Sequence, residues 1–501
     1  MMRHAQTRSM PQVSASVANT IWVVLAVLAC TSVLLLNGRP LFYFDTVGYV
    51  DQGNVALVQL GVVDAPPVDA AMATPEAGQE NAVKTVDGSR SALYSLLAGI
   101  FSQMGALEGL LVLNAAALFL VVWLLARVSQ RIYGPDASRV ALICFPLIAA
   151  SVGSLPFYAA YLMPDLLAPV MILSLALLTA FARQMSWGEL ALAFLIGAFA
   201  VVSHLSHFAI AGLIFLASVL VSILQSRRRW WVGPILVAAV LGAAYAQQTA
   251  FRVMAKSAAK SEVVIRPFIT ARLIQDGPGL RYLESHCPDA GIPTCALFEA
   301  LSWSDDPYRL TASHIIFETT ARLGSFRLMT AADQKAVADA QVGFFVDVLK
   351  EMPVATTLAF VRNALLQSSM VSVDMTLPTD RIVMRNADVT GALSGPLVHG
   401  RLSVDVSWLP PVLRGQEAYY VGALALVLSL LARARSLPAA IKAFAVMVLL
   451  GILANALVCG GISQPATRYG ARVIWLVPFL AAFMVFWAQR GPTASPKASA
   501  K

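Results

Sequence analysis

The stretch MPDLLAPVMILSLALLTAFAR, residues 163–183, decides the fold. From Leu166 to Ala182 it carries no charged residue, and it is bounded by Asp165 and Arg183. An α-helix needs roughly 20 predominantly apolar residues to cross about 30 Å of hydrocarbon. The stretch therefore predicts a membrane-spanning helix over residues 165–182.

The rest of the chain repeats this pattern. Hydrophobic residues make up 58% of the 501 residues and charged residues only 13%, a balance that excludes a fold around one water-soluble core. Further apolar stretches of spanning length lie near residues 19–37, 107–127, 138–155, 187–203, 207–225, 232–249, 417–433, 441–459 and 472–489. The sequence predicts an all-α polytopic membrane protein with about ten transmembrane helices.

Two stretches need separate treatment. Residues 91–104 are apolar but too short for a span, so they predict an interfacial or re-entrant helix. The run from Ile21 to Leu36 follows two arginines, as in a secretory signal, but Asn37-Gly38-Arg39-Pro40 comes next and no small-residue cleavage pattern is present. We interpret this run as a retained first span.

Loop charges give an orientation, because Lys and Arg collect in short cytoplasmic loops. With the N-terminus inside, the cytoplasmic segments carry Arg3, Arg8, Arg127, Arg131, Arg139, Arg183, Arg227, Arg228, Arg229, Arg433, Arg435, Lys442, Arg490, Lys497 and Lys501. The opposite short loops carry none except Arg468. Both termini are therefore expected to be cytoplasmic. The net charge of +8 then reflects topology and attraction to anionic lipids, and no basic patch indicates nucleic acid.

This topology divides the chain into three parts. Residues 1–249 form an N-terminal transmembrane module that includes a first extracytoplasmic loop (38–106), residues 250–416 form a large extracytoplasmic loop region, and residues 417–501 form a C-terminal transmembrane module with a cytoplasmic tail. The Pro/Ala/Gly-rich stretch from Val63 to Gly88 predicts a mobile loop. Residues 353–371 predict a helix on the membrane surface, because Arg362 and Asn363 interrupt the apolar run.

The cysteines separate by predicted location. Cys30, Cys144 and Cys459 lie in predicted spans and are expected to act as small apolar residues. Cys287 and Cys295 flank a turn-like segment in the large outside loop, where an oxidising compartment would allow a disulfide. The alternative is two free thiols, and a metal site is disfavoured because the spacing is not that of zinc ligands.

Carboxylates follow the first span within the stretch FYFDTVGYVD, residues 42–51. Asp45 lies among aromatic side chains, including Tyr49, next to the membrane, so its pKa is expected to be raised to a value that suits a general base. The alternative is that Asp45 only caps a helix. Asp51 is a second candidate, although a solvated loop face explains it equally well.

Other polar residues are expected at the same membrane face. Asp165 begins a span beside Tyr158, where a helix-dipole role is the alternative to a catalytic one. His204 and His207 are three residues apart at a hairpin tip; they could contact phosphate or metal, or simply end a span.

Arginines at the outside face are candidates for binding a phosphate, because guanidinium groups form bidentate hydrogen bonds with phosphate oxygens. Arg468 and Arg472 flank Tyr469 at the outer end of the last span, against the charge trend of the other loops. Arg472 could instead extend to the interface as a structural residue. Arg90, in the first loop, could play the same role.

Together these residues carry a resemblance. The Phe-Asp-x-x-Gly-Tyr segment (44–49), the Gly-Ser-Arg-Ser-x-Leu-Tyr-Ser-Leu-Leu helix start (88–97), Met163-Pro164-Asp165 and the late Ala-Thr-Arg-Tyr (466–469) resemble the GT-C superfamily of polytopic glycosyltransferases. The resemblance implies an active site on the extracytoplasmic face, Asp45 as the catalytic residue, and a polyprenyl-phosphate-linked sugar donor. It also implies location in a bacterial inner membrane and a lipid, glycan or protein acceptor.

Members of this superfamily differ in their use of a divalent cation, and the cofactor stays open here. Asp45 and Asp51 are six residues apart rather than a tight acidic pair. Two other classes share many of these features. An O-antigen ligase or polymerase would keep the outside arginines without a need for Asp45, and a lipid-linked-glycan transporter or flippase would place ionisable groups near mid-membrane.

Overall fold

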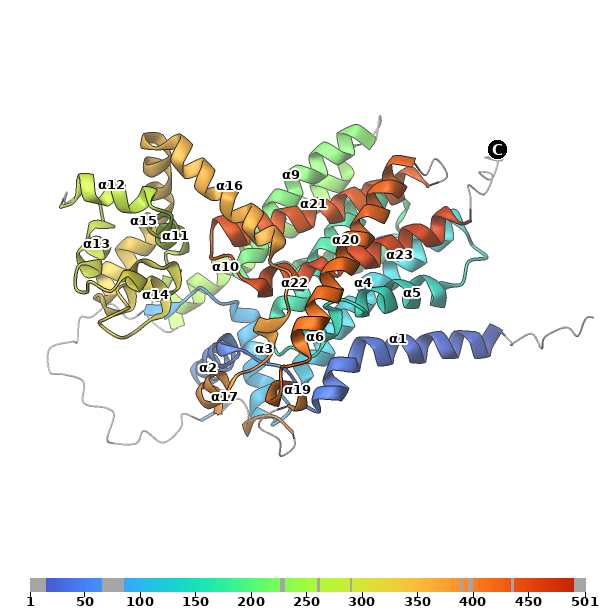
Figure 1. The fold of residues 1–501 in the computed structure, drawn as a ribbon, viewed down its shortest axis with the longest axis horizontal. Coiled ribbons are helices and arrows are strands. Elements are labelled where there is room, and N and C mark those ends of the chain that lie inside the picture. The colour runs from blue at the N-terminus through green and yellow to red at the C-terminus, as the bar shows by residue number, and fades with distance from the viewer. Residues whose placement is uncertain are drawn as a thin grey trace, which may run out of the picture.

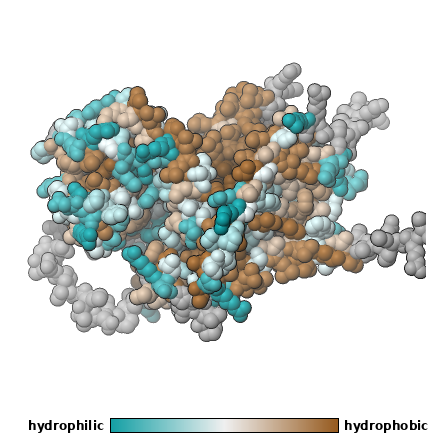
Figure 2. Space-filling view, in the orientation of Figure 1, coloured by the Kyte–Doolittle hydropathy of each residue, from teal (hydrophilic) through white to brown (hydrophobic). Residues whose placement is uncertain are grey.

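The computed structural model describes residues 15–64, 85–225, 230–258, 262–288, 291–387, 391–394, 400–433 and 437–490. These residues form a bundle of long helices with a small helical domain at one end (Figure 1). The surface of the bundle is largely hydrophobic, whereas hydrophilic side chains gather on the small domain (Figure 2). The predicted class, an all-α polytopic membrane protein, agrees with this structure.

The long helices of the bundle are α1 (Ala15–Asn37), α4 (Gly109–Tyr133), α7 (Leu167–Phe181, preceded by a 3₁₀ turn at Pro164–Leu166), α9 (Leu205–Gln225), α10 (Val232–Ala258), α20 (Leu409–Arg433), α21 (Ala439–Gly461), and the nearly continuous pair α22 (Thr467–Ile474) and α23 (Leu476–Ala488). Within the described residues, eight helical segments are long and apolar enough to cross a membrane. The predicted number of about ten is not reached on this measure.

Two predicted spans form helices too short to count as spans on this measure; the first is shorter than predicted, and the second matches its predicted bounds to within one residue. Residues 138–155 form α5 (Arg139–Ser151), 13 residues long, and residues 187–203 form α8 (Trp187–Val202), 16 residues long. At 1.5 Å per residue these helices are about 20 and 24 Å long. Ser138 and Ser186 cap their first turns by accepting backbone hydrogen bonds, so each helix begins where its cap is. After α5 the chain turns at residues 152–154, and a separate short helix, α6 (Leu155–Ala159), follows.

The stretch at 163–183 occupies the centre of the bundle. Every residue of α7 is buried, and α7 packs against α4, α8, α9, α10 and α21. A helix that is apolar on all sides is stable only when other helices or lipid surround it on all sides. This is the physical reason why α7 lies inside the bundle rather than at its edge.

Two shorter helices fill the predicted first loop, α2 (Phe44–Gln59) and α3 (Ala92–Gln103). They cross closely, because Gly53 of α2 lies against the backbone of Gly99 in α3 and neither position has room for a Cβ atom. The short helix α3 corresponds to the predicted non-spanning segment 91–104. Most of the stretch predicted to be a mobile loop (63–88) lies outside the described residues.

The small helical domain comprises residues 262–352 and has its own hydrophobic core. Its helices are α11 (Phe268–Asp276), α12 (Pro278–His286), α13 (Cys295–Leu301), α14 (Ala312–Phe317) and α15 (Ala331–Glu351). The predicted disulfide between Cys287 and Cys295 is confirmed, with a Cα–Cα distance of 5.5 Å. In the part of the chain that is described, the one sheet is a short parallel pair, β1 (Thr85–Asp87) with β2 (Glu262–Val264), which joins the first loop to the domain.

The helix α16 (Pro353–Ser369) leads from the domain back to the bundle, where it packs against α21 and α22 (Figure 1). The short helices α6 (Leu155–Ala159), α17 (Asp380–Arg385) and α19 (Arg401–Val404) complete the described elements. The parts that later form the site, α2, α22, the start of α9 and the segment after β2, therefore converge at the domain end of the bundle.

Candidate functional site

The position of Asp45 follows from the turn after α1. Gly38 adopts a positive φ of 73° and ends the helix. Leu41 then forms a parallel bridge with Tyr161: its N–H donates to the carbonyl of Ala160 at 2.7 Å, and its carbonyl accepts from Leu162 N–H at 2.8 Å. This bridge directs the chain into α2, so that Asp45 lies in the first turn of that helix at the domain end of the bundle.

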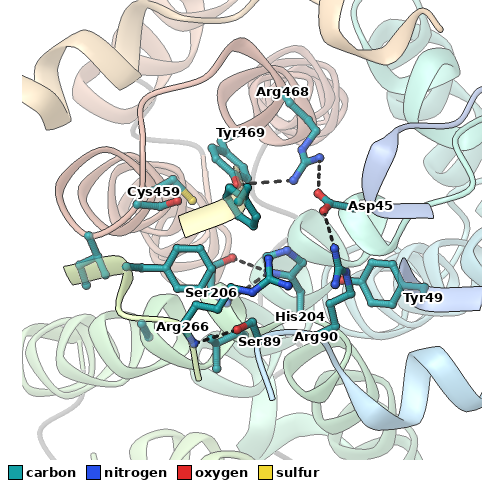
Figure 3. A pocket seen from close by; sticks show the side chains of 16 residues that line it. Asp45, Tyr49, Ser89, Arg90, His204, Ser206, Arg266, Cys459, Arg468 and Tyr469 are labelled. Atoms are coloured by element: carbon teal, nitrogen blue, oxygen red, sulfur yellow. Dashed lines mark hydrogen bonds and ion pairs between the residues drawn. The ribbon is translucent and has the colours of Figure 1, made fainter. Parts of the chain in front are cut away.

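A ladder of alternating charges runs through Asp45. Its members, in order, are Arg266, Asp87, Arg90, Asp45, Arg468, Asp165 and Arg472, and the N···O distances between successive members are 2.7, 3.3, 3.1, 3.0, 3.6 and 3.4 Å. Figure 3 shows Asp45 between the guanidinium groups of Arg468 and Arg90. The ladder connects the small domain, the first loop, and α7 and α22 of the bundle.

One glycine makes the central ion pair possible. A Cβ atom at Gly48 would occupy the space that the Arg90 guanidinium fills. Ser91 caps α3 by accepting from Tyr94 N–H at 3.1 Å, which fixes the start of that helix and with it the residue before it, Arg90. The predicted helix start at 88–97 therefore positions a residue of the ladder.

The start of α22 is held by hydrogen bonds to its backbone. The hydroxyl of Tyr158 donates to the carbonyl of Arg468 at 2.6 Å, and Asn455 Nδ2 donates to the carbonyl of Tyr469 at 2.8 Å. The guanidinium groups of Arg468 and Arg472 each lie 5.0 Å from the ring centroid of Tyr469. Tyr469 thus makes a cation–π contact with both arginines.

Two adjoining cavities open beside the ladder. The inner cavity, of about 160 Å³, is lined by Asp45, Tyr49, Ser89, Arg90, His204, Leu205, Ser206, Ala209, Arg266, Phe268, Phe317, Cys459, Ile462, Ser463, Arg468 and Tyr469. The outer cavity, of about 710 Å³, shares Asp45, Arg90, Arg266 and Arg468 with it and adds, among others, Tyr43, Asp51, Arg327 and Asp374. Three arginines face the inner cavity and only one carboxylate does, so this space attracts anions.

The side chain of Asp45 is 29% exposed and lines both cavities, so a ligand can reach it. Burial raises its pKa, but the charges and hydrogen bonds of Arg468 and Arg90 outweigh burial and hold the pKa well below the ordinary value. The prediction of a raised pKa is therefore wrong. It considered the aromatic surroundings and not the two arginines, which come from positions 45 and 423 residues away.

His204 contributes an uncharged imidazole to the inner cavity. Burial, then the charges of Arg472 and Arg468, lower its pKa to about 3. Its Nδ1 accepts from Ser206 N–H at 3.2 Å, so in the neutral ring the proton is assigned to Nε2. His204 can therefore donate one hydrogen bond and adds no charge.

Four predicted residues lie beneath the cavities rather than along them. Asp165, Arg472, Tyr158 and His207 are fully buried. Arg472 donates to Asn455 Oδ1 at 2.9 Å, and His207 Nδ1 lies 2.7 Å from the carbonyl of Ala200. These residues support the floor of the site. Asp45, Tyr49, Arg90, His204, Arg468 and Tyr469 line the inner cavity, and Asp51 lines the outer one.

Sequence reasoning missed the residues that the small domain supplies. Arg266 lines both cavities, donates to Asp87 Oδ2 at 2.7 Å and lies 5.0 Å from the ring of Phe317. Burial lowers the pKa of Arg266, Asp87 opposes this, and the charges of Arg90 and Arg327 add to the lowering. The pairing of β1 with β2 brings Arg266 to the site. Strands of three residues are too short to recognise in a sequence of this composition, so no sequence signal indicated Arg266.

Cation ligands do not cluster in the described part of the chain, where no group of three or more His, Cys, Asp or Glu side chains is placed to hold a metal ion.

The comparisons with known proteins gave no match: no protein-family model, no curated protein and no solved structure resembles this chain significantly. The geometry and charge of the site are therefore what indicate a function.

Proposed function

We propose that this protein is a membrane glycosyltransferase that moves a sugar from a polyprenyl-phosphate-linked donor to an acceptor at the membrane face where the small domain lies. The observation that carries the proposal is the partly exposed Asp45 carboxylate, held between Arg468 and Arg90 in a cavity rich in arginine at the end of an apolar bundle. A lipid phosphate would reach such a cavity from the bilayer, with its anionic group among the arginines.

The proposed reaction uses Asp45 as the base. The acceptor hydroxyl oxygen bonds to the anomeric carbon of the sugar, its proton passes to Asp45, and the bond from that carbon to the phosphate oxygen breaks, so that polyprenyl phosphate leaves. Arg468, Arg90 and Arg266 would stabilise the negative charge of the leaving phosphate. Because the phosphate would take hydrogen bonds that Asp45 accepts in the empty cavity, donor binding would make the carboxylate a stronger base.

The proposal includes a GT-C-like architecture with ten membrane helices, of which α5 and α8 cross only part of the bilayer. In support, α5 packs against α1 and α23, and α8 packs against α7 and α10. Loop charge favours a cytoplasmic location for both termini, which lie outside the described part of the chain, and the GT-C resemblance implies a bacterial inner membrane. Reporter fusions at residues 229 and 330 should report opposite compartments; the same compartment for both would exclude this topology.

A transporter or flippase of lipid-linked glycans is the second candidate. The buried pair of Asp165 and Arg472 favours it, because ionisable residues inside membrane segments often belong to transport pathways. Both residues, however, lie near the domain end of their helices. The ligase or polymerase class would also use the arginines.

The discriminating experiment is transfer in membrane vesicles that contain the purified protein. We expect a radiolabelled sugar to move from a polyprenyl-phosphate donor to acceptor, with release of polyprenyl phosphate, and Asp45→Asn to abolish the release. Movement of the intact donor across the vesicle membrane, without cleavage of the sugar–phosphate bond, would favour the transporter.

A further inference from the structure

The helix α16 has the reverse of the polarity expected in water. It buries Thr356, Asn363 and Gln367 against the protein. Its exposed face carries the apolar side chains Val354, Leu358, Val361, Leu365 and Leu366, which are 44–70% exposed. A helix with its apolar face outward is stable where that face borders hydrocarbon. The same exposed face carries Arg362, whose side chain is 72% exposed, so α16 fits the membrane surface, with its apolar side chains against lipid and Arg362 at the polar boundary.

The buried polar side chains of α16 fix it in place. Asn363 Nδ2 donates to Asp276 Oδ2 of the small domain at 2.7 Å. Gln367 Nε2 donates to the carbonyl of Ala466 at 3.0 Å, and its Oε1 accepts from Ala466 N–H at 2.9 Å. The same helix thus contacts the domain, the loop that precedes Arg468, and the expected lipid.

A third cavity, which we term the chain cavity, lies behind α16. Its volume is about 130 Å³, and it is lined by Ile269, Arg272, Leu273, Asp276, Phe345, Thr356, Ala359, Phe360, Gly461 and Ile462. The two charged members, Arg272 and Asp276, form an ion pair with each other. The remaining walls are mostly apolar, so the space suits a hydrocarbon group.

The chain cavity adjoins the inner cavity. Ile462 lines both, and the consecutive residues Phe268 and Ile269 line the inner cavity and the chain cavity respectively. An anionic group beside Arg468 therefore has an apolar space next to it, on the side where α16 meets lipid. This juxtaposition matches a molecule with a phosphate at the end of a long hydrocarbon chain.

We propose that the chain cavity binds the hydrocarbon chain of the lipid phosphate whose headgroup occupies the inner cavity. The inference rests on the proposed function for the headgroup, and it adds a site for the chain. A hydrocarbon chain bound here would run along α16 and pass Ile462 to reach the arginines. Residues of α16, rather than those of the ladder, would then determine whether long or short hydrocarbon chains bind more tightly.

The test fills the chain cavity without touching the ladder. Ala359→Phe places an aromatic ring in the cavity, and Ala359→Leu fills it less. Leu358→Phe adds a ring to the exposed face of the same helix and is the matched control. Binding of a long-chain polyprenyl phosphate and of dimethylallyl phosphate, which has a single isoprene unit, is measured with the full-length protein in detergent.

We expect Ala359→Phe to weaken binding of the long-chain phosphate by about tenfold, as displacement of roughly two buried methylene groups would. Ala359→Leu should weaken it less, and dimethylallyl phosphate should bind all variants as it binds the wild type, which also shows that they are folded. Unchanged long-chain binding by both Ala359 variants, or an equal loss for both phosphates, would overturn the chain site and leave the proposed function standing. A wild-type protein that binds neither phosphate would overturn both.

Discussion

Replacement of Asp45 by Asn is the most decisive change that the structure suggests. The amide keeps the size of the carboxylate but cannot take up the acceptor proton. General base catalysis contributes typically 10²–10⁴-fold, so the turnover of a lipid-linked sugar should fall by about that factor. The protein should remain folded, because Arg468 keeps Asp165 as a partner at 3.6 Å and Arg90 keeps Asp87 at 3.3 Å.

Donor binding should respond in the opposite direction. In the empty cavity the Asp45 carboxylate accepts from Arg90 at 3.1 Å and from Arg468 at 3.0 Å, and a donor phosphate would compete with it for both guanidinium groups. Hydrogen bonds to charged groups contribute about 1.5–3 kcal/mol each. Asp45→Asn should therefore bind polyprenyl phosphate as tightly as the wild type or more tightly, while transfer is lost.

The pH dependence follows from the direction of the pKa. Because the pKa of Asp45 is lowered in the folded protein, its ion pairs contribute their full stability above the unfolded aspartate value of about 3.9, and this contribution is lost as pH falls toward the folded pKa. The carboxylate is ionised throughout the neutral range. The pH profile of kcat/KM, which reports the free enzyme, should thus show no acid limb from Asp45 above about pH 4.

The assay is single-turnover release of polyprenyl phosphate, measured beside equilibrium binding of the same lipid. The matched control is Asp51→Asn, which removes a carboxylate of the same helix that lines the outer cavity. This variant should retain most of the transfer activity. Near-normal transfer by well-folded Asp45→Asn would refute the assignment of Asp45 as base. A parallel loss of donor binding would refute the competition between carboxylate and phosphate.

Three further predictions concern the surroundings of Asp45 and the small domain. Arg468→Ala should weaken binding of polyprenyl phosphate by roughly ten- to a hundred-fold, the loss of a charge-assisted hydrogen bond, and a change under twofold in equilibrium binding would contradict its role. Gly48→Ala should displace the guanidinium of Arg90 from Asp45 and lower donor affinity without a large change in thermal stability; wild-type affinity would show that Arg90 is not needed. Replacement of Cys287 and Cys295 by Ser should destabilise the small domain by about 2–3 kcal/mol, the chain-entropy value for a loop this short, while the activity of the folded protein is kept. Denaturant unfolding followed by limited proteolysis of the domain would measure this, and an unchanged midpoint would contradict it.

The sequence predicted those features that depend on local composition. Apolar length located the long helices, the turn-like segment between Cys287 and Cys295 located the disulfide, and the exception to the charge trend located Arg468. Apolar length failed at α5, where the chain turns after Ser151 and the predicted span 138–155 is cut short, whereas α8 follows its predicted bounds to within one residue.

What escaped prediction depends on long-range pairing. Arg266, which was missed, follows β2, and the pairing of β1 with β2 brings it to the ladder. Asp45 and Arg468 were both predicted at this face, but their direct ion pair, across 423 positions, was not. No periodicity in a single sequence encodes such contacts. The error in the pKa of Asp45 has the same origin, since the sign of the shift was set by two distant guanidinium groups rather than by neighbouring aromatic rings.

The balance of charged side chains differs between the outer and the inner cavity. The outer cavity adds Asp51, Asp374 and Arg327 to the residues that it shares with the inner one, so its additional side chains are more negative than positive. The inner cavity has an excess of arginine, and the ladder as a whole holds four arginines and three aspartates. A single phosphodiester anion would neutralise that excess, whereas the buried pair of Asp165 and Arg472 needs no ligand for its own balance. Under the proposed function, a lipid phosphate would be drawn to the arginines of the inner cavity, and the outer cavity would be left for an uncharged, hydroxyl-bearing acceptor.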